Sequence, residues 1–416
     1  METKQSIFKD YENSKKYITM KMDILPIIFR DEQIDLLIDC GFDAVELNEF
    51  QFGMLGETIF EKVIEVLEER GLSIHYLLWK SWRGKYGIQR ALDYDYKKHK
   101  NFVCISAFDE PTQDEVDELK DIFDTLEAKV PNDIYITSNL YPCYVSESVL
   151  GCKYEEHIDK YFKRIVATQK TKKVVSCDYY PFMIKSNGEH YMMDTWAYNH
   201  MLFAKYAKQY GSDLDWCIQS CNYDDHRIVD AQDIKMQMYM CIAFGVKGIC
   251  FFTYATPLLN PDFSHGGSGM IGSNFRPSTM YYAGKEAIAE FRKIEKFYMD
   301  FKWQGTKSFN GTNNGKEKLH DFELLSDELE TFAHIENVSC TENSIVSELY
   351  DEEHSRYGYV VVNYNDPIEG KNDKVHFTLK DADNCIIFLK GEPHEFGKEV
   401  EFELERGGGA LVLIGK

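Results

Sequence analysis

Two adjacent carboxylic acids, Asp109 and Glu110, follow a short apolar segment of this 416-residue chain. Pro111 comes directly after them and ends the apolar segment as a strand, because proline lacks the amide proton that a sheet needs. Thr112 and Glu115 then have the spacing of a capping box, which predicts that a helix begins here. The pattern therefore predicts two carboxylates at the end of a strand, where they could donate and accept protons.

Similar polar or aromatic residues stand at the ends of other strand-like segments in the first 300 residues, and we call these positions strand exits. They carry Asp23; Glu46, Asn48 and Glu49; Trp79, Lys80 and Trp82; Asn139 and Tyr141; Asp178, Tyr179 and Tyr180; Gln219 and Asn222; and Thr253 and Tyr254. Carboxylates and amides bind hydroxyl groups, and aromatic rings stack on the apolar faces of sugars, so the combination favours a carbohydrate site. Each exit alone is also consistent with a structural role, such as an acid pair facing a helix N-terminus.

The elements that must position these residues alternate regularly. Strands are predicted at 18–25, 44–47, 72–79, 102–108, 133–139, 173–178, 214–219 and 246–253. Helices are predicted at 31–39, 58–69, 94–100, 112–129, 154–168, 190–210, 231–244 and 278–301. Eight such pairs predict an α/β fold, a (β/α)8 TIM barrel spanning residues 1–303. An open doubly wound sheet is the alternative, but no G-x-G-x-x-G motif is present and the polar exits are spread over nearly all strands.

The pattern changes after about residue 304. Short alternating segments at 357–364, 374–379, 385–389, 399–404 and 409–414 are separated by turns rich in Gly, Asn, Asp and Pro. They predict a small all-β C-terminal domain, a β-sandwich at 304–416.

Charge and composition narrow the partners. The net charge is −22, from 47 basic and 69 acidic residues, which disfavours binding to nucleic acid or anionic membranes. We expect no transmembrane helix, because no stretch approaches about 18 apolar residues. No zinc motif occurs, so no cofactor or metal is expected. The eleven cysteines form no C-x-x-C pair and favour reduced thiols in the cytoplasm, or secretion if a signal peptide has been removed. The sequence does not define the oligomeric state.

Four short motifs suggest a family. They are Phe108-Asp-Glu-Pro111, Asn139-Leu-Tyr-Pro142, Asp178-Tyr-Tyr-Pro181 and Phe252-Thr-Tyr254. With them, the chain resembles retaining glycoside hydrolases of the (β/α)8 superfamily, especially bacterial β-galactosidase-like proteins and uncharacterised glycosidases with a DEP motif after strand four. The resemblance covers about residues 18–300. It implies a carbohydrate substrate, Glu110 as the acid/base and frequently a C-terminal β-sandwich.

The seventh strand departs from that family. Its members usually carry a nucleophilic glutamate at this strand end, whereas this chain has Gln219, which cannot form a stable glycosyl ester. Asp178 is the first candidate for the second carboxylate, as the base of an inverting reaction or as a nucleophile. Glu46 or Glu49 is the second candidate. The remaining alternative is a TIM barrel that binds carbohydrate without cleaving it.

We therefore predict a glycoside hydrolase that cleaves an oligo- or polysaccharide, with Glu110 as general acid and Asp178 as base or nucleophile. Further residues are predicted to support them or bind substrate, namely Asp109, Glu46, Glu49, Trp79, Trp82, Asn139, Tyr141, Tyr180, Gln219, Asn222 and Tyr254. A barrel lyase or aldolase that forms a Schiff base through Lys80 or Lys247 is a further alternative.

Overall fold

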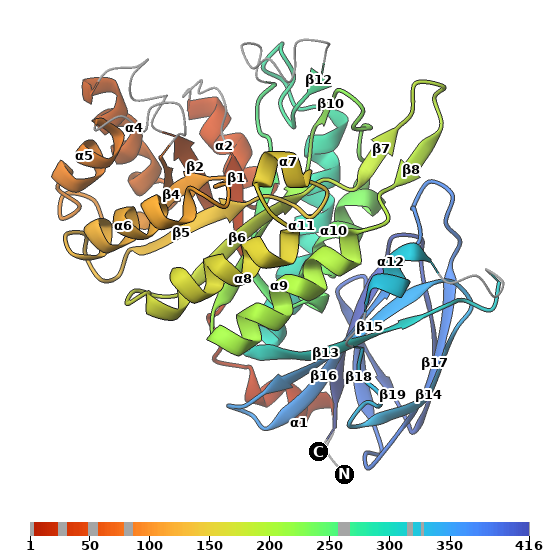
Figure 1. Cartoon of the computed structure of the whole chain (residues 1–416). Helices are drawn as coiled ribbons and strands as arrows, with labels where there is room; N and C mark the ends of the chain where they lie inside the picture. Colours follow the sequence, from red (N-terminus) through yellow and green to blue (C-terminus); the bar gives the residue numbers. More distant parts are fainter. Residues whose placement is uncertain are drawn as a thin grey trace.

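The computed structural model describes residues 4–23, 31–48, 57–78, 86–256, 267–313, 319–325 and 328–415. Eight parallel strands close into a barrel in the order β1-β11-β9-β6-β5-β4-β3-β2, which confirms the predicted fold (Figure 1). The strands are β1 (Thr19–Asp23), β2 (Ala44–Asn48), β3 (Ser73–Leu77), β4 (Phe102–Asp109), β5 (Tyr135–Leu140), β6 (Val174–Tyr179), β9 (Asp213–Gln219) and β11 (Val246–Phe252).

Helices surround the barrel and bury one apolar face against it. They are α2 (Asp31–Cys40), α4 (Glu57–Glu69), α5 (Tyr86–Asp93), α6 (Val116–Glu127), α7 (Glu147–Leu150), α8 (Tyr154–Arg164), a 3₁₀ turn η2 (Val166–Thr168), α9 (Trp196–Tyr210), α10 (Ala231–Ala243) and α11 (Thr279–Tyr298). In α6 the buried residues recur at helical spacing, as Val116, Leu119, Ile122, Phe123 and Leu126. By contrast, α10 is buried on all sides from Asp233 onward, because it lies between the barrel and the C-terminal domain.

The helix predicted at 94–100 is absent, and α5 lies before it at Tyr86–Asp93. Two other predicted helices begin later than expected. The predicted helix at 190–210 starts only at Trp196, since β8 (His190–Met192) pairs with β7 (Phe182–Ile184) in a hairpin above the barrel. The predicted helix at 112–129 starts at Val116. The Glu115 carboxylate still accepts hydrogen bonds from the Thr112 amide and hydroxyl, both at 2.9 Å, so the predicted contact forms one turn before the helix. A second small pair joins β10 (Asn222–Tyr223) to β12 (Gly267–Ser268).

The C-terminal domain is the predicted β-sandwich. Its larger sheet has the order β13-β15-β16-β21-β18-β19, and the smaller has β14-β17-β20. These strands are β13 (Phe301–Phe309), β14 (Ile335–Cys340), β15 (Ser344–Asp351), β16 (Arg356–Asn363), β17 (Asp373–Leu379), β18 (Cys385–Leu389), β19 (Glu392–Phe396), β20 (Glu399–Leu404) and β21 (Gly409–Ile414). A short helix, α12 (His320–Leu324), precedes β14.

The larger sheet is buried on both faces. In β16, Val360 and Val362 belong to the core shared with the barrel, whereas Val361 packs toward the smaller sheet. The residues of β21 alternate in the same way. The N-terminal helix α1 (Lys4–Asp10) also packs against this sheet, with the Phe8 and Phe388 rings stacked at 6.1 Å. Sheet and barrel therefore share one continuous apolar core.

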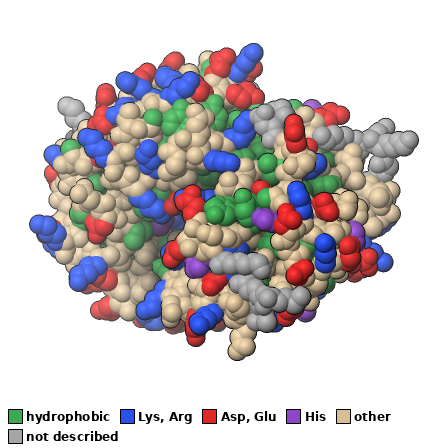
Figure 2. Space-filling model, turned by 90° about the horizontal axis from the view of Figure 1, so that it is seen from below, with side chains coloured by type: hydrophobic (Ala, Val, Ile, Leu, Met, Phe, Trp, Pro, Cys, Tyr) green, Lys and Arg blue, Asp and Glu red, His purple; other side chains and the backbone are tan. Residues whose placement is uncertain are grey.

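The surface and the thiols agree with the composition. Acidic and basic side chains are interspersed over the face seen in Figure 2. All eleven cysteines are free, and nine of them are buried. Within the described residues, no helix combines the length and apolar character needed to cross a bilayer.

Candidate active site

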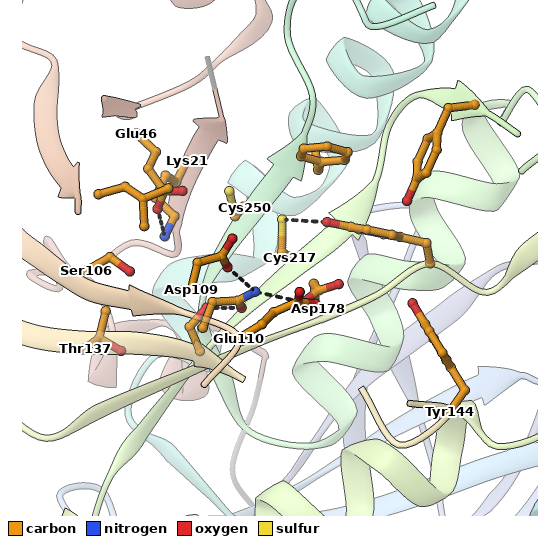
Figure 3. Close-up of a pocket in the computed structure, with 16 residues that line it drawn as sticks. Lys21, Glu46, Ser106, Asp109, Glu110, Thr137, Tyr144, Asp178, Cys217 and Cys250 are labelled. Atoms are coloured by element: carbon orange, nitrogen blue, oxygen red, sulfur yellow. Dashed lines mark hydrogen bonds and ion pairs between the residues drawn. The ribbon is translucent and has the colours of Figure 1, made fainter. Parts of the chain in front are cut away.

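A cavity of about 240 Å³ lies inside the carboxyl ends of the barrel strands (Figure 3). All eight barrel strands, or the residues directly after them, contribute to its wall. The lining residues are Lys21, Glu46, Leu77, Ser106, Asp109, Glu110, Thr137, Asn139, Tyr144, Ser176, Asp178, Tyr180, Cys217, Tyr223, Cys250 and Phe252. A site at this end of a parallel barrel is the position where such folds place their chemistry.

Six of the residues predicted from the sequence meet in this cavity. They are Glu46, Asp109, Glu110, Asn139, Asp178 and Tyr180. Figure 3 shows Asp109, Glu110 and Asp178 gathered in one region and Glu46 paired with Lys21 in another. The predicted residues Glu49, Trp79 and Trp82, and Lys80 of the aldolase alternative, lie outside the described residues.

Four predicted site residues lie outside the cavity lining. The Tyr254 hydroxyl is buried and donates to the carbonyl of Gln33 at 2.8 Å. The Asn222 side-chain oxygen accepts from the amide of Ser268 at 3.1 Å and so holds β10 to β12. Tyr141 is half-buried and packs against the barrel core. Gln219 is the fourth. These side chains thus make contacts within the protein, and none of the four is among the residues that line the cavity.

Gln219 is fully buried, and both of its amide N–H groups are used. Nε2 donates to the carbonyls of Phe182 and Arg227, both at 3.1 Å, and Oε1 accepts from the amide of Phe182 at 3.0 Å. These bonds fasten the β7 hairpin and the following loop to the end of β9. The prediction that Gln219 binds a ligand hydroxyl is thus not supported. The residue of β9 that lines the cavity is Cys217.

An amide joins two of the carboxylates. Asn139 Nδ2 donates to Asp178 Oδ1 at 2.7 Å and to Asp109 Oδ1 at 3.3 Å, so the two oxygens are at most about 6.0 Å apart. Ser176 Oγ donates to Asn139 Oδ1 at 3.1 Å, which fixes the orientation of the amide. Asn139, predicted to bind substrate, therefore directs its donors toward the two carboxylates and holds them close together.

Asp178 has a pKa far from the ordinary value of an aspartic acid. Only 7% of its surface is exposed, and this burial raises its pKa to about 7. The hydrogen bond from Asn139 opposes the rise, and the negative charge of Asp109 adds to it. Near neutral pH a large fraction of Asp178 therefore carries a proton, as a general acid requires.

Glu110 lies where β4 ends. A register shift between Ser106 and Asp109 marks a bulge in the pairing of β4 with β5, and Glu110 itself has a φ of +52°. This left-handed conformation is uncommon outside glycine. The Glu110 amide donates to the carbonyl of Asn139 at 2.9 Å, which anchors the turn to the next strand. The bulge and this bond hold Glu110 at the cavity wall beside Asp109.

Aromatic rings form another part of the wall. The rings of Tyr180 and Phe252 are stacked at 5.4 Å, with 19° between their planes. Tyr223 meets Tyr180 edge-on at 6.4 Å. Tyr144 is 43% exposed although it lines the cavity, so its ring is accessible to a ligand. Stacked apolar surface beside carboxylates suits the mixed polar and apolar character of a sugar ring.

Sequence reasoning missed several lining residues, and strand alternation could have found some of them. Side chains two residues apart on a strand point to the same side. Lys21 precedes the exit residue Asp23 by two positions, Ser176 precedes Asp178, and Cys217 precedes Gln219. Tyr144 lies in a loop, where no such period applies.

Two other groups with chemical potential lie outside this cavity. Asp300, Asp351 and His354 are close enough to share a metal ion, the single such group found among the described residues. His354 Nδ1 is already bonded to Asp351 Oδ2 at 2.7 Å, so we interpret this group as a structural contact where the barrel meets the C-terminal sheet. Lys247, the other lysine of the aldolase alternative, donates to the Phe301 carbonyl at 2.6 Å and lines a different cavity.

Known structures provide a comparison for the fold. The chain matches no protein-family model, and no curated protein sequence is significantly similar to it. It is similar to the E323A catalytic mutant of Gan42B, a GH42 β-galactosidase from G. stearothermophilus, with 9% identity, a TM-score of 0.62 and coverage of 96% of this chain and 98% of that one. A second structure of Gan42B gives 9% identity, a TM-score of 0.60 and coverage of 95% and 98%. The chain thus shares the fold of this β-galactosidase along nearly its whole length, whereas the resemblance found in the sequence covers about residues 18–300.

Proposed function

We propose that the protein is a glycoside hydrolase in which Glu110 and Asp178 form the catalytic carboxylate pair. The observation that carries the proposal is the convergence of both acids, together with Asp109, on one cavity at the carboxyl end of the barrel. Glycosidic cleavage requires one acid to protonate the leaving oxygen and a second carboxylate to act as nucleophile or base. The aromatic wall and the overall similarity to a β-galactosidase support a sugar as the substrate.

We assign the proton-donor role to Asp178 and the nucleophile or base role to Glu110. Asp178 has the pKa of about 7 that a donor needs near neutral pH, because burial and the negative charge of Asp109 outweigh the opposing hydrogen bond from Asn139. This order is the reverse of the one that the sequence predicts. Asp109 remains a supporting carboxylate, since its charge favours retention of the proton on Asp178.

Aryl glycosides with different leaving groups test both the function and the roles. The parent protein is expected to hydrolyse at least one sugar of a panel. On glycosides with poor leaving groups, Glu110→Gln and Asp178→Asn should each lose about 10²-fold or more of this activity. Loss of the proton donor matters least for a leaving group that departs without protonation. Asp178→Asn should therefore retain most of its activity on the best leaving groups, whereas Glu110→Gln should be impaired on all. The opposite result would restore the order predicted from the sequence.

A carbohydrate-binding barrel without turnover is the second candidate. It is favoured by β9, which offers Cys217 to the cavity and no carboxylate, at the strand where the resembled family places its nucleophile. This alternative predicts that the parent binds sugars with no hydrolysis, and that binding survives in Glu110→Gln.

A further inference from the structure

A layer of polar side chains crosses the middle of the barrel. Lys21, His75, Tyr135 and Asp215 come from β1, β3, β5 and β9, which are alternate strands of the closed sheet. Lys21, His75 and Asp215 are 4%, 2% and 7% exposed. Alternate strands of such barrels normally fill a layer with bulky apolar residues. An ammonium and a carboxylate in this place need compensating contacts, because burial of an isolated charge is costly.

Neighbouring positions are shaped to accommodate this layer. A Cβ added to Gly248 of β11 would lie 2.3 Å from Asp215 Oδ1, so only glycine leaves room for the carboxylate. The Tyr135 hydroxyl donates to Asp215 Oδ2 at 3.3 Å and lies 3.5 Å from His75 Nδ1. Burial holds the pKa of His75 well below its usual range, so the imidazole is neutral. The layer is thus arranged around one cation, Lys21.

Lys21 stays charged in this setting. Burial alone would lower the pKa of its ammonium, but the charge of Glu46, with smaller contributions from Cys250 and Asp215, outweighs that effect and raises the pKa well above its usual value. Lys21 Nζ lies 3.2 Å from Glu46 Oε2. Both side chains line the candidate active site, whereas His75, Tyr135 and Asp215 line a second cavity of about 360 Å³. The layer therefore separates the two cavities and presents Lys21 and Glu46 to the upper one.

The charge around the upper cavity limits what can bind there. Among the described lining residues, Lys21 is the one cation, against the carboxyl groups of Glu46, Asp109, Glu110 and Asp178. An anionic substituent would meet this excess of carboxylates in a confined, partly dehydrated space. An uncharged ring with neighbouring hydroxyls suits the pair, because a hydroxyl can accept from the ammonium while its neighbour donates to the carboxylate.

We propose that Lys21 and Glu46 form a hydroxyl-binding pair that holds an uncharged sugar ring in the cavity and excludes uronides and sugar phosphates. Lys21 donates to one ring hydroxyl, and Glu46 accepts from the adjacent one. Tyr135 and Asp215 position the pair from the opposite side of the layer. This inference rests on the proposed function, because it names the class of sugar that the same site recognises.

Deoxy analogues of whichever aryl glycoside the parent hydrolyses test the pair. Removal of a contacted hydroxyl should lower kcat/KM of the parent by about 10- to 100-fold, as expected for a hydrogen bond to a charged group. In Lys21→Met or Glu46→Gln that discrimination should fall to about twofold or less. Lys247→Met is the matched control, since it removes another lysine of the barrel interior that lines the second cavity. It should discriminate as the parent does. The parent should also prefer the neutral glycoside over the matching uronide by at least about tenfold.

Several outcomes separate this inference from the proposed function. Hydrolysis with equal discrimination in Lys21→Met and Lys247→Met would overturn the hydroxyl-binding pair and leave the glycosidase proposal intact. If the parent hydrolyses nothing, calorimetric titration with free neutral sugars replaces kinetics. Binding that is weakened in Lys21→Met but not in Lys247→Met would then support the pair without catalysis. No binding of any neutral sugar would overturn both. If Lys21→Met does not fold, Glu46→Gln, which keeps the ammonium in the layer, decides the question.

Discussion

Replacement of Asp178 by asparagine should make the protein more stable at alkaline pH. The carboxyl has a pKa of about 7 in the folded protein and an ordinary value of 3.8. Below about pH 3 the carboxyl is protonated in both the folded and the unfolded protein, so folding buries no charge at this position. As pH rises toward 7 the unfolded state loses the proton more readily, so folding loses stability, and above pH 7 the loss is constant. A pKa that is about three higher in the folded than in the unfolded protein corresponds to roughly 4 kcal/mol of unfolding free energy.

Asparagine mimics the protonated acid in size and can still accept the bond that Asn139 donates to Asp178 Oδ1. The gain in unfolding free energy of Asp178→Asn over the parent should be about 2 to 3 kcal/mol larger at pH 8 than at pH 5. Urea unfolding at the two pH values, followed by circular dichroism, measures this difference. Asp225→Asn changes an exposed carboxylate and serves as the control. The same variant should lose activity on glycosides with poor leaving groups, as expected when a catalytic residue is a source of strain.

An equal gain at pH 5 and pH 8 would refute the reasoning, because a neutral packing effect does not depend on pH. A larger gain at pH 5 would mean that the Asp178 carboxylate is stabilised by its surroundings. In that case Asp178 could not be the proton donor, and the assignment of roles would have to be reversed.

Three further outcomes follow from other parts of the structure. Asp109→Asn removes a negative neighbour and should lower the pKa of Asp178, so the alkaline limb of the pH–activity profile should move to lower pH. Gly248→Ala should lower the unfolding free energy by about 1 to 3 kcal/mol, because its Cβ meets a carboxylate oxygen, whereas Gly397→Ala meets no atom within 4 Å and should have little effect in the same thermal melt. Arg227→Met leaves two carboxylates without their buried partner and should cost about 3 to 5 kcal/mol in guanidinium unfolding; an unchanged midpoint would contradict this.

The barrel could be predicted from the sequence because every β/α unit repeats the same signals. Apolar segments followed by amphipathic ones were sufficient to predict all eight barrel strands. Strands of the C-terminal domain were harder to identify. Phe301–Phe309 directly continues a helix and carries Lys302, Gln304 and Lys307 among its apolar residues, so its alternation is weak. Ser344–Asp351 contains buried Ser347 and Glu348, which bond to other side chains inside the sheet and hide the apolar pattern.

The candidate site was predictable to the extent that strand ends determine it. Glu110 and Asp178 needed only their positions at two exits. Lys21 was missed because it lies in mid-strand, where a barrel normally places an apolar residue, and its role depends on partners far away in the sequence. Gln219 was predicted to bind substrate because it ends a strand, but its amide bonds to Phe182 of the β7–β8 hairpin, and the sequence pattern placed only the second strand of that hairpin in a helix.

The packing of α1 determines when the chain can finish folding. Lys4 Nζ donates to the carbonyl of Pro393 at 2.8 Å, and Arg356 Nη2 donates to Asp10 at 2.6 Å. Helix α1 therefore lacks these partners until β16 and β19 have been synthesised, and the whole barrel emerges in between. Contacts of such long sequence separation form late, so we expect docking of α1 on the C-terminal sheet to be a slow step. Both ends also lie side by side, away from the rim of the barrel (Figure 1). A fusion partner or surface attachment at either end would thus leave the candidate active site open.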